Sequence, residues 1–342
     1  MKRIIAHLDM DAFFASIEEV STPGFLGKPI VVGSTGKRGV VSTANYKARE
    51  YGIHSAQPIS IARKLGGEEV IFLGVDFELY ERVSKNILKI IKNYATTIEQ
   101  ASIDEFYIDF SFLKTFKKTE QICKKIKNEI KQKEKITCSI GISKNKLISK
   151  IASDIDKPDG LLLVKNIKAF LNPLPIKKIP GIGPKTEKIL NIKTIQDLSK
   201  LKKEDLKNLL GKRGLKIYNY ARGIDNEPVI KYREVKSIGE QTTFEENTKE
   251  VPLIFDTFEK LLSSVFEKFK KSNFSKFKTI TITIRFSDFQ TKTSSKTFEK
   301  GISNQKQFNT NSIKLLLPFL DKRKNPKQKL IRLVGVRIEN LI

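Results

Sequence analysis

The chain has 342 residues, of which 39% are hydrophobic and 30% charged, a composition typical of globular proteins. No segment reaches the ~18 apolar residues of a membrane span, and the N-terminus lacks a signal-peptide pattern, so we expect a cytoplasmic protein without membrane contact. Two cysteines and two histidines, with no CxxC motif, argue against a zinc site.

The charge is unevenly distributed along the chain. The net charge is +26, yet residues 1–110 contain 13 basic and 14 acidic residues, so the excess of lysine and arginine lies in residues 111–342. A lysine-rich solvated surface would produce such a bias. A basic footprint for a nucleic acid is the sharper interpretation.

Hydrophobic periodicity predicts a mixed α and β chain. In residues 1–110 we expect strands at 4–8, 29–33, 98–102 and 106–110, and helices at 12–20, 42–51, 59–65 and 79–94. Further along we expect a helix at 121–133, a strand at 135–142, a helix at 145–155, and short helices with turns from 166 to 230. After a polar linker, the pattern predicts helices at 251–271 and 305–320 and strands at 279–286, 292–298 and 329–338.

Acidic residues stand at the ends of two predicted strands. Asp9 and Asp11 close the first strand, and Asp104 and Glu105 lie between two later strands. Carboxylates near a core are costly unless they are paired or bind a metal. If these strands are neighbours, the acids form a site for hard divalent cations such as Mg²⁺. Turn caps and lysine partners are the alternative for any single acid.

Three basic or hydroxyl side chains are candidates for binding phosphate. Tyr46 and Arg49 share one face of a predicted helix, and Lys157 lies in the turn DKPDG. Each of them alone is a weak indication, because exposed basic residues are usually solvated.

The segment PGIGPK at 180–185 indicates a helix-hairpin-helix. A Gly-x-Gly turn between short helices exposes backbone N–H groups to phosphate, and the neighbouring lysines add positive charge. Gly181, Gly183 and Lys185 are therefore candidates for binding the DNA backbone, with a second, degenerate hairpin at 211–214. An ordinary helical turn is the alternative.

Six ordered segments resemble the Y-family (translesion) DNA polymerases, in particular the DNA polymerase IV (DinB-type) branch. They are HLDMDAFFASIEE at 7–19, GVVSTANYKAREYGIHSAQPI at 39–59, ASIDEFYID at 101–109, SIGISKNKLISKIASDIDKPDG at 139–160, the hairpin at 179–190 and KSIGEQTTFEE at 236–246. The resemblance runs over nearly the whole chain.

The resemblance implies a template-directed DNA polymerase that adds dNTPs to the primer 3′-OH of primer-template DNA. It implies two Mg²⁺ ions, with Mn²⁺ as a substitute, held by the catalytic acids Asp9, Asp104 and Glu105 and by the Met10 carbonyl, with no metal role for Asp11. The nucleotide contacts implied are Phe13, Phe14, Tyr46, Arg49 and Lys157. Phe14 matches the steric gate, a ring that leaves no room for a ribose 2′-OH.

The implied fold is an α+β, multidomain right-hand polymerase. A ferredoxin-like palm would comprise 1–10 and 77–165, small fingers 11–76, a helical thumb with the helix-hairpin-helix 166–231, a linker 232–240 and an α+β little finger 241–342. Small fingers and the absence of room for an exonuclease imply low fidelity without proofreading, in DNA damage tolerance and repair. We expect a monomer. Residues 338–342 do not clearly match the family's peptide for the sliding clamp, which leaves clamp binding open.

Two alternatives belong to other functional classes. A non-catalytic DNA-binding repair factor with the same fold would be expected to have lost at least one of the three acids. A palm-type nucleotidyl cyclase would need neither the hairpin nor the basic C-terminal half.

Overall fold

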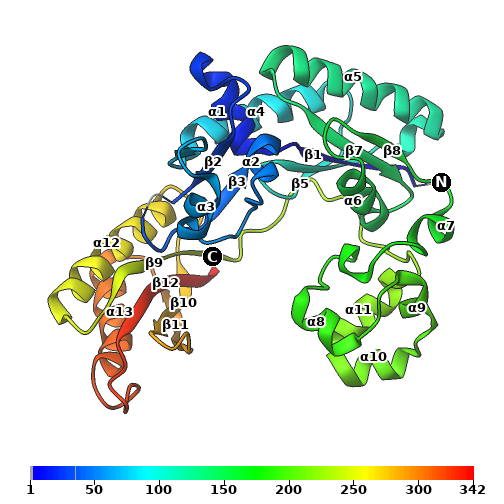
Figure 1. The fold of residues 1–342 in the computed structure, drawn as a ribbon. Helices are drawn as coiled ribbons and strands as arrows, with labels where there is room; N and C mark the ends of the chain where they lie inside the picture. The colour runs from blue at the N-terminus through cyan, green and yellow to red at the C-terminus, as the bar shows by residue number, and fades with distance from the viewer. Residues whose placement is uncertain (1–2, 35) are drawn as a thin grey trace. The chain divides into compact units, whose positions relative to one another are not determined.

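The computed structural model describes residues 3–34 and 36–342 and is shown in Figure 1. Residues 1, 2 and 35, which belong to the predicted palm and fingers, lie outside the described residues. The chain divides into two compact units. The first contains residues 3–34 and 39–232, and the second contains residues 36–38 and 233–342.

A five-stranded sheet forms the centre of the first unit, in the order β5-β6-β1-β7-β8. Its strands are β1 (Ile5–Met10), β5 (Ile98–Gln100), β6 (Glu105–Asp109), β7 (Cys138–Ser143) and β8 (Leu161–Leu163). The long helices are α4 (Phe77–Lys92) and α5 (Phe116–Glu134), and a short 3₁₀ turn, η2 (Ser111–Leu113), precedes α5. The succession β1-α4-β5-β6-α5-β7, with β1 antiparallel to both β6 and β7, is the ferredoxin-like arrangement predicted for the palm.

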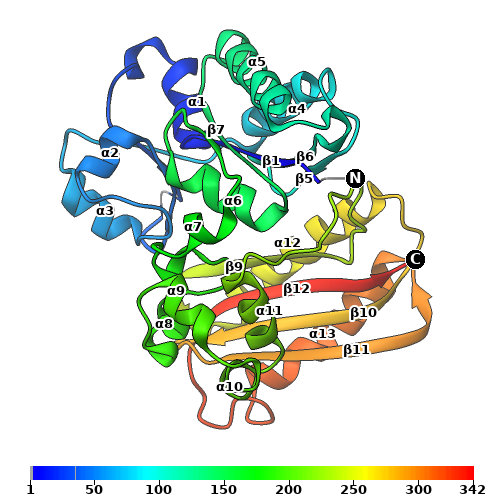
Figure 2. The same cartoon turned by 90° about the vertical axis from the view of Figure 1, so that its right-hand side faces the viewer.

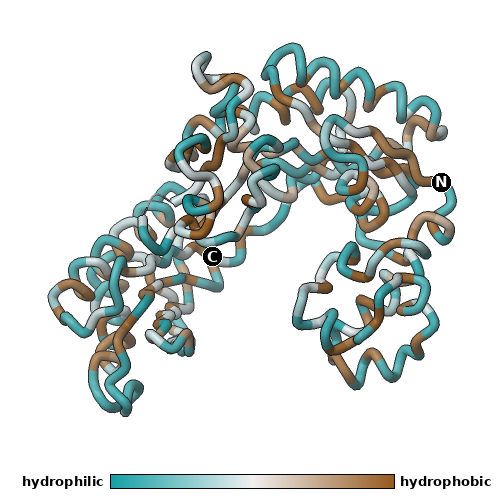
Figure 3. The backbone as a smooth tube through the Cα atoms, in the orientation of Figure 1, coloured by the Kyte–Doolittle hydropathy of each residue, from teal (hydrophilic) through white to brown (hydrophobic). Residues whose placement is uncertain are grey.

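Alternation along the strands separates an apolar face from a polar one. Ala6 and Leu8 join the core under α4 and α5, whereas His7 and Asp9 point to the opposite face. In Figure 3, brown hydrophobic stretches follow the strands, while α5 is mainly teal with brown at intervals, as its single buried stripe requires.

Helix α6 (Lys146–Ile155) covers the polar face, opposite α4 and α5 (Figures 1 and 2). Gly141 on β7 permits this close approach, because a Cβ there would lie 2.0 Å from the carbonyl oxygen of Ser149. Ser149 Oγ donates to the Ile5 carbonyl at 2.7 Å. Small residues on both elements therefore bring α6 directly onto the acid-bearing strands.

A smaller sheet, in the order β3-β2-β4, lies between β1 and α4 in the sequence. Its elements are α1 (Phe13–Ser21), η1 (Pro23–Phe25), β2 (Ile30–Gly33), β3 (Val41–Ala44), α2 (Tyr46–Glu50), α3 (Ile59–Gly66) and β4 (Ile71–Leu73). The predicted helix at 42–51 is wrong in its first half, because residues 41–44 pair with β2 as a strand. Asn45 ends that strand and caps α2 by accepting from the Ala48 N–H.

Two helical hairpins follow the large sheet. The elements are α7 (Ile167–Leu171), η3 (Ile176–Lys178), α8 (Pro184–Leu190), α9 (Ile195–Lys200), α10 (Lys203–Leu210) and α11 (Lys212–Ala221). Gly211 turns between α10 and α11 at φ +61°, and Gly214 packs where a Cβ would lie 1.9 Å from the Leu206 carbonyl oxygen. The chain then returns to the large sheet, where Glu99 accepts from the Ile230 N–H at 3.0 Å and pairs with buried Lys146.

The second unit is a four-stranded antiparallel sheet in the order β11-β10-β12-β9, with two helices on one face (Figure 2). Its elements are β9 (Ser237–Thr248), α12 (Val251–Lys270), β10 (Phe277–Phe286), β11 (Thr291–Ile302), α13 (Gln305–Leu320) and β12 (Ile331–Leu341). β9 begins at Ser237, inside the segment 232–240 predicted as a linker, because Ser237 pairs with Glu339 of β12. None of the helices in residues 3–34 and 36–342 is long and apolar enough to cross a membrane.

Candidate active site

Asp9 and Glu105 face each other at one end of the large sheet. They are register partners of the antiparallel pair β1 and β6, and Ser139 of β7 is the partner of Asp9 on its other side. All three side chains therefore lie on the polar face that α6 covers. Asp9 is buried, at 6% exposure, and Glu105 is half-buried. Two of the three predicted acids are thus brought together by strand pairing.

Lys157 is the cation that faces Asp9. Its Nζ lies 2.6 Å from Asp9 Oδ1, and Asp154 is a more distant partner at 3.9 Å. Burial raises the pKa of Asp9 to about 7 although Lys157 opposes the shift, and the nearby Glu105 adds to it. Burial disfavours the ionised form of Asp9, so an additional cation beside the carboxylate would stabilise that form.

Glu105 has a different environment from Asp9. Lys150 on α6 pairs with Glu105 Oε1 at 2.5 Å, and His7 Nε2 lies 3.8 Å from Oε2. The His7 ring and Lys150 hold the pKa of Glu105 below its usual range. At 3.8 Å the imidazole acts through its electrostatics, because that separation is too long for a hydrogen bond. Burial lowers the pKa of His7, which also shares a 2.7 Å hydrogen bond between Nδ1 and Ser153 Oγ.

Asp104 lies beside the other two acids through its backbone but not through its carboxylate. Its carbonyl accepts from the Met10 N–H at 3.1 Å, while its Oδ1 accepts from Ser102 Oγ at 2.6 Å. Among the described residues, accordingly, no group of three His, Cys, Asp or Glu side chains is already arranged around a metal position. Asp9 and Glu105 lie at one end of the sheet with lysines as their partners, whereas the Asp104 carboxylate is bonded to Ser102.

Tyr46 presents a buried polar atom to this region. Its hydroxyl has no hydrogen-bond partner among the residues the structure describes. Burial raises its pKa to about 12, with Asp11 and Asp9 among the contributing charges. The Arg49 guanidinium lies 4.5 Å from the Tyr46 ring centroid, and its Nε donates to the Ala44 carbonyl. The predicted Tyr-Arg pair therefore exists, with a hydroxyl available for a ligand.

The two neighbouring phenylalanines of α1 have different surroundings. Phe13 belongs to the hydrophobic core at 2% exposure, so any nucleotide contact would involve its backbone. Phe14 is half-buried and stacks on Tyr80, with centroids 4.2 Å apart and an interplanar angle of 11°. The phenol of Tyr80 in turn donates to Glu18 at 2.6 Å. Phe14 is thus held in a fixed orientation.

The predicted hairpin residues lie in the turn between η3 and α8 and at the start of α8. Gly181 adopts φ +96°, a conformation that favours glycine, and Gly183 precedes α8. Lys185 is exposed on the first turn of α8. Arg213, from the second hairpin, donates to the Gly181 carbonyl and joins the two turns. The structure therefore places the glycine turn and an exposed lysine next to each other in the chain, as the hairpin pattern predicts.

Lys150 was missed by the sequence reasoning. It faces the sheet because it lies one turn after buried Lys146 on α6, and Ser149 and Ser153 fall on the same side. Two lysines four residues apart, alternating with small serines, were the available signal. That pattern becomes informative only when α6 is known to cover acids.

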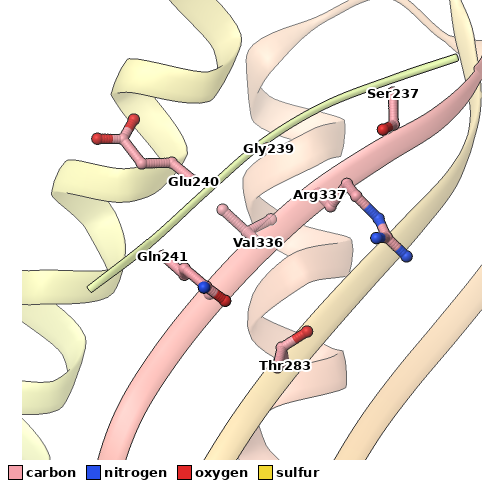
Figure 4. Close-up of a pocket in the computed structure, with 8 residues that line it drawn as sticks. Ser237, Gly239, Glu240, Gln241, Thr283, Val336 and Arg337 are labelled. Atoms are coloured by element: carbon pink, nitrogen blue, oxygen red, sulfur yellow. The ribbon is translucent and has the colours of Figure 1, made fainter. Parts of the chain in front are cut away.

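The open face of the second unit's sheet is hollowed where three strands meet (Figure 4). A cavity of about 400 Å³ is lined by small and polar residues of β9, β10 and β12, including Gly239, Gln241, Thr283, Gly335 and Arg337. Gly239 pairs with Arg337 and Gly335 with Gln241, so each larger side chain lies opposite a glycine. This face offers hydroxyl, amide and guanidinium groups around a hollow that the glycines leave open.

Comparisons with known proteins cover almost the whole chain. Residues 8–154 match the impB/mucB/samB family, residues 164–191 match the IMS family HHH motif, and residues 235–342 match the impB/mucB/samB family C-terminal domain. The chain is 40% identical to DNA polymerase IV 2 of Methanosarcina mazei, over 99% of the chain and 93% of that protein. It is 38% identical to a DNA polymerase IV of Clostridium perfringens, over 99% and 94%.

Solved structures agree with the sequence relatives. A Y-family DNA polymerase chimera of Dbh and Dpo4 superposes with a TM-score of 0.89, at 32% identity and 99% coverage of both chains. DinB from Sulfolobus solfataricus superposes with a TM-score of 0.65, again at 32% identity and 99% coverage of both. The mixed α+β multidomain fold is confirmed, and the family assignment favours a polymerase over the repair-factor and cyclase alternatives. The chain belongs to the impB/mucB/samB family and is a Y-family, translesion-type DNA-directed DNA polymerase of the DNA polymerase IV branch.

Proposed function

We propose that Asp9, Asp104, Glu105 and the Met10 carbonyl hold two Mg²⁺ ions, with Mn²⁺ as a substitute, for addition of dNTPs to a primer 3′-OH. The donor set fits, because carboxylate and carbonyl oxygens are the ligands that Mg²⁺ prefers. The observation that carries the proposal is the buried Asp9, whose pKa is raised to about 7 beside a second carboxylate. When bound, the ions would activate the 3′-OH and neutralise charge on the triphosphate.

The lysines beside these acids have a second task in this proposal. Lys157 holds Asp9 at 2.6 Å, and Lys150 holds Glu105 at 2.5 Å. With cations bound to the carboxylates, Lys157 would be free to bind the triphosphate, together with Arg49 and the Tyr46 hydroxyl, which has no hydrogen-bond partner among the described residues. Phosphoryl transfer needs mainly positioning and charge stabilisation, which these groups supply.

Phe14 would exclude ribonucleotides from the same site. Its ring is fixed by stacking on Tyr80, and Phe77 lies edge-on at 6.2 Å. A fixed ring under the sugar discriminates better than a mobile one, because it cannot turn away from a 2′-OH.

Two surfaces would grip primer-template DNA. In the first unit, the turn with Gly181 and Gly183, followed by Lys185, offers backbone N–H groups and a charge to phosphates. In the second unit, the open sheet face provides Thr283, Gln241 and Arg337. Neither surface needs to read base sequence. We assign the palm to 1–10 and 77–165, the fingers to 11–76, the thumb to 166–231 and the little finger to 241–342.

Primer extension with wild-type and Asp104→Ala protein tests the acid assignment. We expect Asp104→Ala to reduce extension by at least ~100-fold, because removing charge stabilisation at a transition state costs about 3 kcal/mol or more. Mg²⁺ titration by calorimetry provides a second readout, in which the variant should bind more weakly. Asp109→Ala, on the far end of β6, is the matched control. Equal extension by Asp104→Ala and wild type would refute the assignment.

A further inference from the structure

Asp11 is a buried acid to which neither the resemblance nor the proposed metal site assigns a role. It is 1% exposed. Ser139 Oγ donates to its Oδ1 at 2.8 Å, and Thr137 Oγ1 donates to its Oδ2 at 2.8 Å. No lysine or arginine among the described residues pairs with it, so neutral donors alone stabilise the carboxylate. Such a group is costly to bury, which makes its third partner informative.

That third partner is the backbone of the turn that carries Lys157. The Asp159 N–H donates to Asp11 Oδ2 at 2.8 Å. Asp159 adopts φ 53°, and the next N–H, of Gly160, donates to Ser139 Oγ at 3.2 Å. The Asp11 and Ser139 side chains together fasten two consecutive N–H groups of the turn to the ends of β1 and β7.

The far side of the same turn is held by α5. Lys127 Nζ donates to the carbonyls of Cys138 and Gly160, each at 2.8 Å, and lies 2.9 Å from Asp159 Oδ1. Lys131 adds a second ion pair to Asp159 at 3.0 Å. These contacts anchor the turn to the sheet, but none of them reaches the end of β1, where Asp9 lies.

Asp11 therefore makes one of two contacts that join the end of β1 to the turn. Asp9 and Asp11 are two residues apart at the end of β1, and Asp159 and Lys157 are two residues apart in the turn. The hydrogen bond from Asp159 to Asp11 and the ion pair from Lys157 to Asp9 join the two segments. When Lys157 leaves Asp9 for another anion, the hydrogen bond from Asp159 to Asp11 is the contact between the end of β1 and the turn that remains.

We propose that Asp11 is a positioning residue that holds the Lys157 turn in place for the incoming nucleotide's triphosphate. This inference rests on the proposed function, in which Lys157 contacts that triphosphate. Without the Asp11 carboxylate, the turn keeps its attachments to α5 and to Ser139 of β7, and its remaining link to the end of β1 is the ion pair from Lys157 to Asp9. The ammonium group of Lys157 then has to be ordered when the nucleotide binds, which weakens binding and leaves the acids in place.

The first test compares nucleotide affinity and turnover in Asp11→Asn, Lys157→Ala and the double variant. Asn keeps the size of Asp but places an N–H₂ group against one of three donors. We expect Asp11→Asn to raise KM for dNTP by ~10-fold with kcat within ~3-fold, and Lys157→Ala to raise it by ~10–100-fold. Binding of dNTP to a complex with a dideoxy-terminated primer should show the same loss without chemistry.

The double variant separates the inference from the proposed function. If Asp11 acts through Lys157, Asp11→Asn adds nothing in the Lys157→Ala background. Additive losses would overturn the positioning role. If Lys157→Ala leaves nucleotide affinity unchanged, the triphosphate role of Lys157 fails. If Lys157→Ala weakens binding and Asp11→Asn does not, only the inference about Asp11 fails.

Hydrogen exchange measures the anchoring without nucleotide or metal. The Asp159 amide should exchange at least ~10-fold faster in Asp11→Asn, whereas the amides of α6 keep their protection. Asp109→Asn is the matched control, since Asp109 also accepts a backbone N–H, from Ser111 at 2.8 Å, at the far end of the sheet. If Asp11→Asn does not fold, Thr137→Val removes one donor to Asp11, and Ser139→Ala removes another together with the acceptor of the Gly160 N–H; each should raise KM ~3-fold. Unchanged exchange at Asp159 together with unchanged KM would overturn the proposal.

Discussion

Lys157 Nζ lies 2.6 Å from Asp9 Oδ1, and Lys150 Nζ lies 2.5 Å from Oε1 of Glu105, which belongs to the neighbouring strand. The two acids are register partners on adjacent strands. The lysines reach them from above the polar face, Lys150 from α6 and Lys157 from the turn after α6. Each acid is therefore matched with its own cation. This pairing leads to expectations for Lys150 and for Asp9.

Replacing Lys150 with methionine should destabilise the metal-free protein by ~1–2 kcal/mol at pH 7, because Glu105 loses its charged hydrogen-bond donor. The pKa of Glu105 is lowered in the folded protein, so its stabilisation is present above its ordinary pKa of 4.5 and is lost as the pH falls. The difference between wild type and Lys150→Met should therefore shrink below about pH 4.5.

Urea unfolding in EDTA measures this difference. Lys124→Met is the matched control, because Lys124 pairs with Glu120 on the exposed face of α5 and should contribute at most ~0.5 kcal/mol. Equal effects of the two substitutions at pH 7 would contradict the role assigned to Lys150.

Asp9 should show the opposite pH dependence. Burial raises its pKa to about 7, so the folded state binds the proton more tightly than the unfolded chain. The stability of wild type relative to Asp9→Asn should fall as the pH rises from about 4 to about 7, by up to ~1.4 kcal/mol per pH unit, and then level off. Chemical unfolding of both proteins across this range in EDTA is the measurement.

Magnesium provides the internal check on Asp9. Adding Mg²⁺ at pH 8 should stabilise wild type and leave Asp9→Asn nearly unchanged, because ligand binding stabilises only the state that binds. Parallel pH curves for the two proteins, with or without Mg²⁺, would show that Asp9 is not perturbed by its burial.

Substituting Phe14 with alanine should admit ribonucleotides. We expect the ratio of rNTP to dNTP incorporation to rise by at least ~10-fold, because the ring that would meet a 2′-OH is removed. Single-nucleotide insertion with matched rNTP and dNTP measures the ratio. Phe112→Ala, which removes an exposed ring of η2 beside Phe110, serves as the control and should leave sugar selectivity unchanged.

Lys185 should contribute charge to DNA binding without affecting chemistry. We expect Lys185→Ala to weaken binding to primer-template DNA of any sequence and to reduce the slope of log K against log salt by about 1. Fluorescence anisotropy at several salt concentrations gives the slope. Lys200→Ala is the control, since Lys200 pairs with Asp197 on α9 at 2.9 Å. An unchanged slope for Lys185→Ala would remove this hairpin from the DNA contacts.

Several features follow from the sequence alone because they depend on local pattern. Alternation in β1 places Ala6 and Leu8 on one face and His7 and Asp9 on the other, whatever surrounds the strand. Likewise, the Gly-x-Gly turn before α8 requires the positive φ that Gly181 adopts. The three acids, the hairpin and the ferredoxin-like order could thus be predicted from neighbouring residues and from resemblance.

Other features depended on contacts between residues far apart in the chain. Residues 41–44 form a strand because β2 is present to pair with them, although their own pattern suggested a helix. Asp104 turns its carboxylate to Ser102, and Lys150 meets Glu105 only because Gly141 lets α6 approach the sheet. The link from Asp11 to the Lys157 turn spans 148 residues. Local periodicity determined which face of each strand is polar, whereas tertiary packing decided which lysine, acid and turn meet on that face, because side-chain partners are set by distance in space.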